Sequence, residues 1–127
     1  MRPNECSGST LAFIGDAVWS LFVRDYLVEK GYTKAKDLQT KSVEFVSAKA
    51  QASFYGRLKE ENFFTEEEEV IFKRGRNFKS ESVPKNTSVG TYRISTGFEA
   101  LIGYWHLTQN DARLKQIWDK VRTMMEE

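Results

Sequence analysis

Apolar side chains occupy nearly every position in two segments of the chain, LAFIGDAVWSLFV at 11–23 and FEALIGYWHL at 98–107. In each segment they continue round the whole circumference of a helix instead of forming one stripe, which is typical of a helix buried on most sides. The first helix is expected over about 10–30, because Gly31 is the usual kind of residue just past a helix end. The second is expected over about 92–107. The pattern therefore predicts two central helices.

The rest of the chain shows amphipathic helical patterns. A helical region is expected over about 35–62, with a break near Ser47 before a run of small residues. Thr65 is followed three residues later by a glutamate, the spacing of a capping box, and that helix should end near Gly75. The last helix is expected to start near Asp111, with apolar residues at core spacing. No stretch alternates with the period of two of a strand, so the predicted fold class is all-α.

Length and composition fit one domain. A chain of 127 residues with 40% apolar residues can bury one hydrophobic core, and it has no internal repeat or low-complexity linker. We therefore predict a single domain over 1–127, with residues 1–9 frayed. The segment 78–90 reads FKSESVPKNTSVG and combines Pro84 with many serines and threonines. Such a composition predicts a flexible basic loop.

Cysteine, histidine and hydropathy exclude several classes of protein. The lone Cys6 cannot build an intramolecular disulfide framework, which favours a reducing, cytoplasmic compartment. With one cysteine and one histidine the sequence has no zinc-site pattern. The histidine, His106, is interpreted as a packed or surface residue, because a lone histidine on a helix is more often that than a general base. No apolar run reaches the roughly 18 residues of a membrane span, so no membrane partner is expected.

Positive charge gathers in one part of a chain whose net charge is only +1. Between 73 and 93 a series of basic residues is interrupted by a single acidic one, whereas glutamates dominate 60–69. One interpretation is that both runs are solvated faces, as most charge runs are. The other is that the basic run binds the phosphates of a polyanion. Its members are Lys73, Arg74, Arg76, Lys79, Lys85 and Arg93.

Each of the two apolar helices carries one acidic residue, Asp16 in the first and Glu99 in the second. Burying an unpaired carboxylate costs several kcal/mol, a large part of the stability of a small domain. Each carboxylate therefore needs a partner. One alternative is an arginine or lysine, which would make the pair purely structural. The other is a shared divalent cation, and oxygen ligands without nearby histidine or cysteine suit Mg²⁺ or Mn²⁺.

Several motifs, in the right order over about residues 10–110, carry a resemblance to a known family. FIGDAV at 13–18 resembles the signature helix of ribonuclease III catalytic domains, and FEALIGYWHL resembles the second acidic helix of that family. The whole chain is similar to the short subgroup called Mini-ribonuclease III, which has the catalytic domain without a separate double-stranded-RNA-binding domain. Further matches are VSAKAQA (46–52), TEEEE (65–69), RGRN (74–77) and VPKNT (83–87).

The resemblance implies an all-helical homodimer that hydrolyses double-stranded RNA by a metal-activated water, with Mg²⁺ as cofactor and Mn²⁺ as an alternative. Members of the subgroup are associated with ribosomal RNA maturation, chiefly of the large-subunit precursor. On this basis Asp16 and Glu99 are expected to be the catalytic metal ligands, and Phe13 is expected at the dimer interface. The expected RNA-binding residues are Arg74, Arg76, Lys79, Lys85 and Asn86.

The sequence departs from the wider family at two positions. A glutamate four residues before the aspartate and an aspartate three residues before the glutamate are replaced here by Ala12 and Thr96. Helical spacing places each on the same face as its remaining carboxylate, Asp16 or Glu99. We therefore expect one metal, with water and RNA phosphate completing its shell. Two alternatives stay open: a catalytically inactive domain that binds structured RNA or ribosomal particles, and a helical protein-interaction scaffold.

Overall fold

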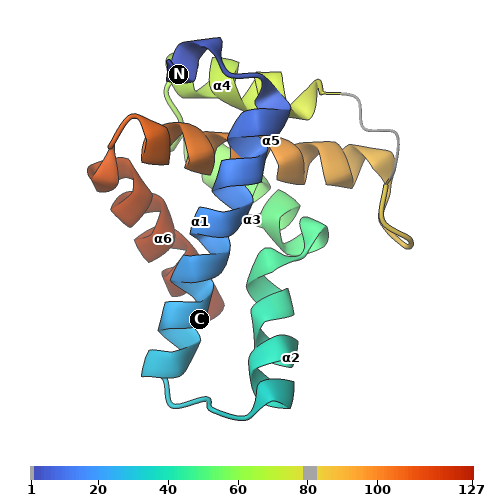
Figure 1. The fold of residues 1–127 in the computed structure, drawn as a ribbon, viewed down its shortest axis with the longest axis vertical. Coiled ribbons are helices and arrows are strands. Elements are labelled where there is room, and N and C mark those ends of the chain that lie inside the picture. Colours follow the sequence, from blue (N-terminus) through green and yellow to red (C-terminus); the bar gives the residue numbers. More distant parts are fainter. Residues whose placement is uncertain (1, 79–82) are drawn as a thin grey trace.

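The computed structural model describes residues 2–78 and 83–127, and within these residues the chain is helical with no strand (Figure 1). The predicted all-α class is thereby confirmed. A short 3-10 turn precedes the α-helices in chain order. The elements are η1 (Pro3–Glu5), α1 (Gly8–Glu29), α2 (Ala35–Val46), α3 (Ala48–Glu60), α4 (Glu66–Arg76), α5 (Val89–Leu107) and α6 (Asp111–Met125).

Serine and threonine caps set where the helices begin. The predicted capping box is present at Thr65, whose hydroxyl accepts from the backbone N–H of Glu68 at 3.1 Å. The predicted break falls at Ser47, which ends α2 and caps α3. The two central helices start earlier than predicted, because Ser7 caps α1 and Ser88 caps α5. Their side chains replace backbone partners that a first turn lacks, which extends each helix toward its cap.

The two apolar helices cross each other at the centre of the fold, where α1 runs over α5 (Figure 1). Glycines permit the close approach. A Cβ atom at Gly15 would overlap the carbonyl oxygen of Glu99, and a Cβ atom at Gly103 would overlap the carbonyl oxygen of Leu11. The backbones therefore touch directly at the crossing. This contact is what brings residue 16 of one helix beside residue 99 of the other.

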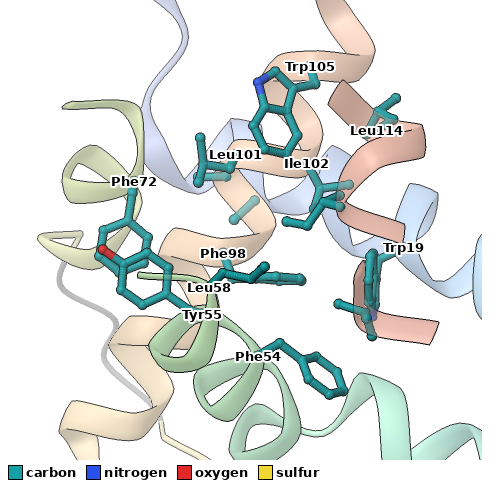
Figure 2. Close-up of a cluster of buried hydrophobic side chains, with 14 of the residues drawn as sticks. Trp19, Phe54, Tyr55, Leu58, Phe72, Phe98, Leu101, Ile102, Trp105 and Leu114 are labelled. Carbon is teal, nitrogen blue, oxygen red and sulfur yellow. The ribbon is translucent and has the colours of Figure 1, made fainter. Parts of the chain in front are cut away.

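Aromatic side chains form much of the core between the crossing and the surrounding helices (Figure 2). Trp19 of α1 contacts Phe98 of α5 edge-on, with ring centroids 5.0 Å apart. Its indole N–H donates to the carbonyl of Phe45 at 3.0 Å, which ties α2 to α1. Tyr55 of α3 stacks on Phe72 of α4 at 3.8 Å. Large aromatic surfaces in such geometries contribute strongly to core stability. Around this core, α5 packs against α1, α3 and α4.

The N-terminal segment, for which the sequence predicted fraying, makes specific contacts. Cys6 is buried, and the guanidinium of Arg74 donates to the carbonyls of Asn4 at 3.0 Å and Cys6 at 3.4 Å. The Tyr104 hydroxyl donates to the side chain of Asn4 at 2.9 Å. These partners lie far away in the sequence, which is why local composition did not indicate them.

Part of the predicted basic loop 78–90 lies outside the described residues, namely 79–82. Pro84 and Thr87 enclose a turn, in which the Thr87 N–H donates to the Pro84 carbonyl at 3.3 Å, and α5 begins at Val89.

In the described part of the chain, no helix combines the length and the apolar character that crossing a bilayer requires.

Candidate active site

Asp16 and Glu99 line one cleft of about 440 Å³ beside the crossing of α1 and α5. The crossing positions them, because Gly15 brings the backbone before Asp16 against the backbone of Glu99. Asp16 is exposed, whereas Glu99 is only partly exposed. The two carboxylates that the sequence singled out on separate helices therefore face a common space. The other lining residues are Ser9, Ala12, Phe13, Val46, Ala48, Gln51, Phe78, Pro84, Tyr92, Ser95 and Thr96.

The electrostatics of the pair are unusual. Burial, together with hydrogen bonding to Asp16 and the charge of Asp16, raises the pKa of Glu99 from 4.5 to about 9. The amide of Gln51, whose Nε2 lies 3.4 Å from Oε2 of Glu99, acts in the opposite direction. A neighbouring carboxylate disfavours the charged form of Glu99, and a nearby cation favours it. A bound divalent ion would be such a cation.

A purely structural ion pair does not account for the two acids. In residues 2–78 and 83–127 neither Asp16 nor Glu99 forms a salt bridge with an arginine or a lysine. Glutamates that are neutralised internally are found elsewhere, as where Arg113 binds Glu68 at 2.6 Å. The described structure therefore does not support the interpretation that Asp16 and Glu99 are paired with arginine or lysine for a purely structural purpose.

The donor set suits one hard divalent cation. Mg²⁺ in proteins is commonly held by one or two carboxylates, with water and substrate phosphate filling its other positions. Among the described residues no cluster of three or more acidic, histidine or cysteine side chains exists that could hold a metal. Ala12 is buried in the cleft wall, and the hydroxyl of Thr96 donates to the Tyr92 carbonyl at 3.0 Å. The two replaced family positions thus line the same cleft without adding charge.

The predicted RNA-binding residues lie in different surroundings. The guanidinium of Arg74 is engaged by the N-terminal carbonyls, and Arg76 donates to the side chain of Asn77 at 3.1 Å. Lys85 and Asn86 are exposed in the turn before α5. Lys79 lies outside the described residues. None of these four described side chains lines the cleft, but the neighbouring Phe78 and Pro84 do.

Phe13, which the resemblance places at a dimer interface, is 78% exposed. It also lines the rim of the cleft that holds Asp16. Leu21 and Val28 are exposed on the same helix, at 58% and 59%. At 100° per residue, 13, 21 and 28 fall on one face of α1. Exposed Arg24 falls on the same face, so α1 presents exposed apolar residues interrupted by one charge, beginning at the site itself.

His106 does not belong to this cleft. It lines a separate groove between α1 and α6, together with Leu21, Phe22 and Trp118. Although His106 lies seven residues after Glu99 on α5, the two residues line different clefts. The structure thus gives His106 no place next to the carboxylate pair.

Gln51 is the site residue that sequence reasoning missed. It is 1% exposed and approaches Glu99 from α3, a third helix. The sequence did contain a signal for it. Phe54, Tyr55 and Leu58 lie on the buried face of α3, and position 51, one helical turn before Phe54 and Tyr55, lies on the same face. A polar residue at a core position of an amphipathic helix indicates a specific buried partner.

The fold and the carboxylate pair together define a class. Residues 9–110 match the Ribonuclease III domain family. The chain therefore belongs to the ribonuclease III family, and the enzyme class predicted from the motifs, an endoribonuclease, is confirmed.

Individual relatives narrow the similarity to the short subgroup. The chain is 49% identical over 113 residues to the Mini-ribonuclease 3 of Enterococcus faecalis, covering 89% of this chain and 86% of the relative. It is 49% identical over 114 residues to that of Streptococcus pneumoniae, covering 90% and 89%. The X-ray crystal structure of a protein from Fusobacterium nucleatum has a TM-score of 0.84 to this fold at 34% identity, covering 95% of each chain.

Proposed function

We propose that this protein is a Mg²⁺-dependent endoribonuclease that cleaves double-stranded RNA at the Asp16–Glu99 cleft. The observation that carries the proposal is the convergence of two carboxylates on one open cleft with no arginine or lysine pairing either of them among the described residues. Such a pair binds a cation rather than stabilising the fold. Mn²⁺ has the same preference for oxygen ligands and is expected to substitute.

The chain's own residues have distinct roles in this proposal. Exposed Asp16 offers its carboxylate to solvent and substrate, whereas partly buried Glu99 is held in the cleft wall beside Gln51. The metal, when bound, would supply an activated water and offset the charge on the departing oxygen. Glu99 would hold the cation in its deprotonated form, because a nearby positive charge lowers a carboxyl pKa. Asp16 and Glu99 are thus the proposed catalytic residues and metal ligands.

RNA binding in the proposal depends on phosphate contacts outside the cleft. Double-stranded RNA is recognised mainly by shape, 2′-hydroxyls and phosphates. Exposed Lys85 and Asn86 precede α5, which carries Glu99, so they can hold a duplex whose scissile phosphate enters the cleft. Arg74, Arg76 and Lys79 remain proposed contacts from the sequence pattern. The resemblance favours a large-subunit ribosomal RNA precursor as the duplex and the cytoplasm as the compartment.

A homodimer is part of the same proposal. The exposed apolar residues of α1, Phe13, Leu21 and Val28, would be covered by a second copy, since exposed apolar residues gathered on one face can mark an interaction site. Because Phe13 also lines the cleft rim, the partner would lie beside the site. Sedimentation equilibrium of the wild type and of Phe13→Asp tests this assembly.

Cleavage of a labelled RNA duplex tests the activity directly. With Mg²⁺ we expect wild-type cleavage that EDTA abolishes, and we expect Asp16→Asn and Glu99→Gln to lose cleavage while still folding and binding the duplex. Near wild-type cleavage by either variant would refute the assignment of the pair.

The absence of two family acids at Ala12 and Thr96 favours a second candidate function. In this alternative the domain binds structured RNA or ribosomal particles without cutting them. Duplex binding without any product at high protein concentration and saturating Mg²⁺ would support it over the nuclease.

A further inference from the structure

A buried amide from a third helix contacts Glu99 of the carboxylate pair. Gln51 is 1% exposed, and its side-chain Nε2 donates to Oε2 of Glu99 at 3.4 Å. This is a long hydrogen bond by the usual criteria. Catalytic hydrogen bonds are often long in ligand-free proteins and shorten when the complex forms. The side chain is therefore aimed at one particular oxygen of a proposed metal ligand.

The backbone fixes where Gln51 points. Ser47 separates α2 from α3, its hydroxyl accepts from the Ala50 N–H at 3.1 Å, and its carbonyl accepts from the Gln51 N–H at 3.0 Å. Gln51 thus lies in the first, capped turn of α3. One turn later, Phe54 contacts Phe98, the residue before Glu99, with ring centroids 6.4 Å apart. Packing therefore holds the amide and the carboxylate in a fixed relation.

The choice of residue type is informative. Position 51 continues the buried stripe of Phe54, Tyr55 and Leu58, where an apolar residue would ordinarily stabilise the domain. A buried amide without a hydrogen-bond partner destabilises a fold, so a glutamine at this position indicates a specific partner, here Glu99. An arginine or lysine would neutralise Glu99 and compete with a cation. A neutral donor orients the carboxylate and leaves its charge available.

We propose that Gln51 is a positioning residue, whose amide holds Oε2 of Glu99 so that the carboxylate is oriented for a divalent cation shared with Asp16. The inference rests on the proposed function. Partners that orient a metal ligand typically change metal affinity by 10–100-fold when they are removed. Gln51 acts through Glu99 and needs no contact with RNA.

The test uses Gln51→Met, which keeps the size and length of the side chain and removes the donor. Gln39→Met is the matched control, because Gln39 is exposed on α2 and does not line the cleft. Mn²⁺ binding to the RNA-free protein is measured by electron paramagnetic resonance, unfolding by urea, and cleavage as a function of Mg²⁺. If Gln51→Met does not fold, Gln51→Asn retains the amide but shortens its reach by one methylene.

We expect Gln51→Met to unfold at the same urea concentration as wild type or a higher one, yet to bind Mn²⁺ about 10-fold more weakly. The Mg²⁺ concentration for half-maximal cleavage should rise by the same factor, and saturating Mg²⁺ should restore kcat. Gln39→Met should match wild type in every measurement. Unchanged Mn²⁺ affinity in a folded Gln51 variant would overturn the inference while leaving the nuclease intact. If wild type neither binds Mn²⁺ nor cleaves, the proposed function itself fails.

Discussion

Adding one methyl group at Gly15 should separate the two central helices. A Cβ atom there would lie 2.7 Å from the carbonyl carbon of Glu99, 2.8 Å from the backbone nitrogen of Gly103, and closer still to the Glu99 carbonyl oxygen. All three obstacles are backbone atoms of α5, which cannot rotate aside as a side chain could. Gly15→Ala therefore requires α1 and α5 to move apart.

The magnitude follows from two opposing terms. Overpacking a well-packed core costs typically 1–3 kcal/mol, and a collision between two backbones belongs at the upper end of this range or above it. Replacing glycine with alanine inside a helix returns about 1 kcal/mol. We expect a net loss of about 2–3 kcal/mol in the free energy of unfolding. For a domain of this size, that corresponds to a Tm lower by roughly 10 °C.

Gly56 of α3 provides the matched control. It is also a helical glycine, but a Cβ atom there would meet nothing within 4 Å. Gly56→Ala should therefore stabilise the protein by up to about 1 kcal/mol, through helix propensity alone. Urea denaturation followed by circular dichroism measures both variants against wild type, and the two changes in midpoint should have opposite signs.

The same substitution should affect the site, because the crossing at Gly15 sets the distance between Asp16 and Glu99. A misplacement of about 1 Å can reduce a rate by about 100-fold, so Gly15→Ala should cleave duplex RNA far more slowly even where it is fully folded. Gly56→Ala should cleave normally. If Gly15→Ala unfolds at the wild-type urea concentration or above it, the helices are not in backbone contact and the explanation of the site geometry is wrong.

Two further predictions concern charge. Folding raises the pKa of Glu99 from 4.5 to about 9, so between these pH values the folded state binds more protons than the unfolded state. The free energy of unfolding, measured in EDTA, should therefore fall as pH rises through this window. Glu99→Gln should flatten this pH profile. An identical pH dependence in both proteins would contradict the raised pKa. Lys85→Ala should reduce the slope of log affinity for duplex RNA against log salt by roughly one. Lys120→Ala, which removes an ammonium paired with Glu61 at 2.9 Å, should leave that slope unchanged, and an equal effect of both variants would refute a specific contact at Lys85.

Local sequence patterns predicted most of the secondary structure. Thr65 with the glutamate that follows it, Ser47 between two helical patterns, and the all-round apolar character of 11–23 were each readable from spacing alone, and the structure confirms the elements they predicted. The helix starts at Gly8 and Val89 were missed by two or three residues, because a serine cap extends a helix beyond its apolar pattern. The role of Arg74 in holding the N-terminal turn depends on a partner about 70 residues away and leaves no local signal.

The sequence by itself determined that two apolar helices each carry one acid, and its motifs identified the ribonuclease III family. Periodicity shows which residues face a core, since it depends only on positions within one helix. Only the tertiary structure decided that Asp16 and Glu99 share a cleft, that no described arginine or lysine neutralises them, and that Gln51 contacts Glu99 from a third helix. The physical reason is that these relations depend on how closely helices cross. At Gly15 and Gly103 that distance is set by backbone contact between segments more than 80 residues apart.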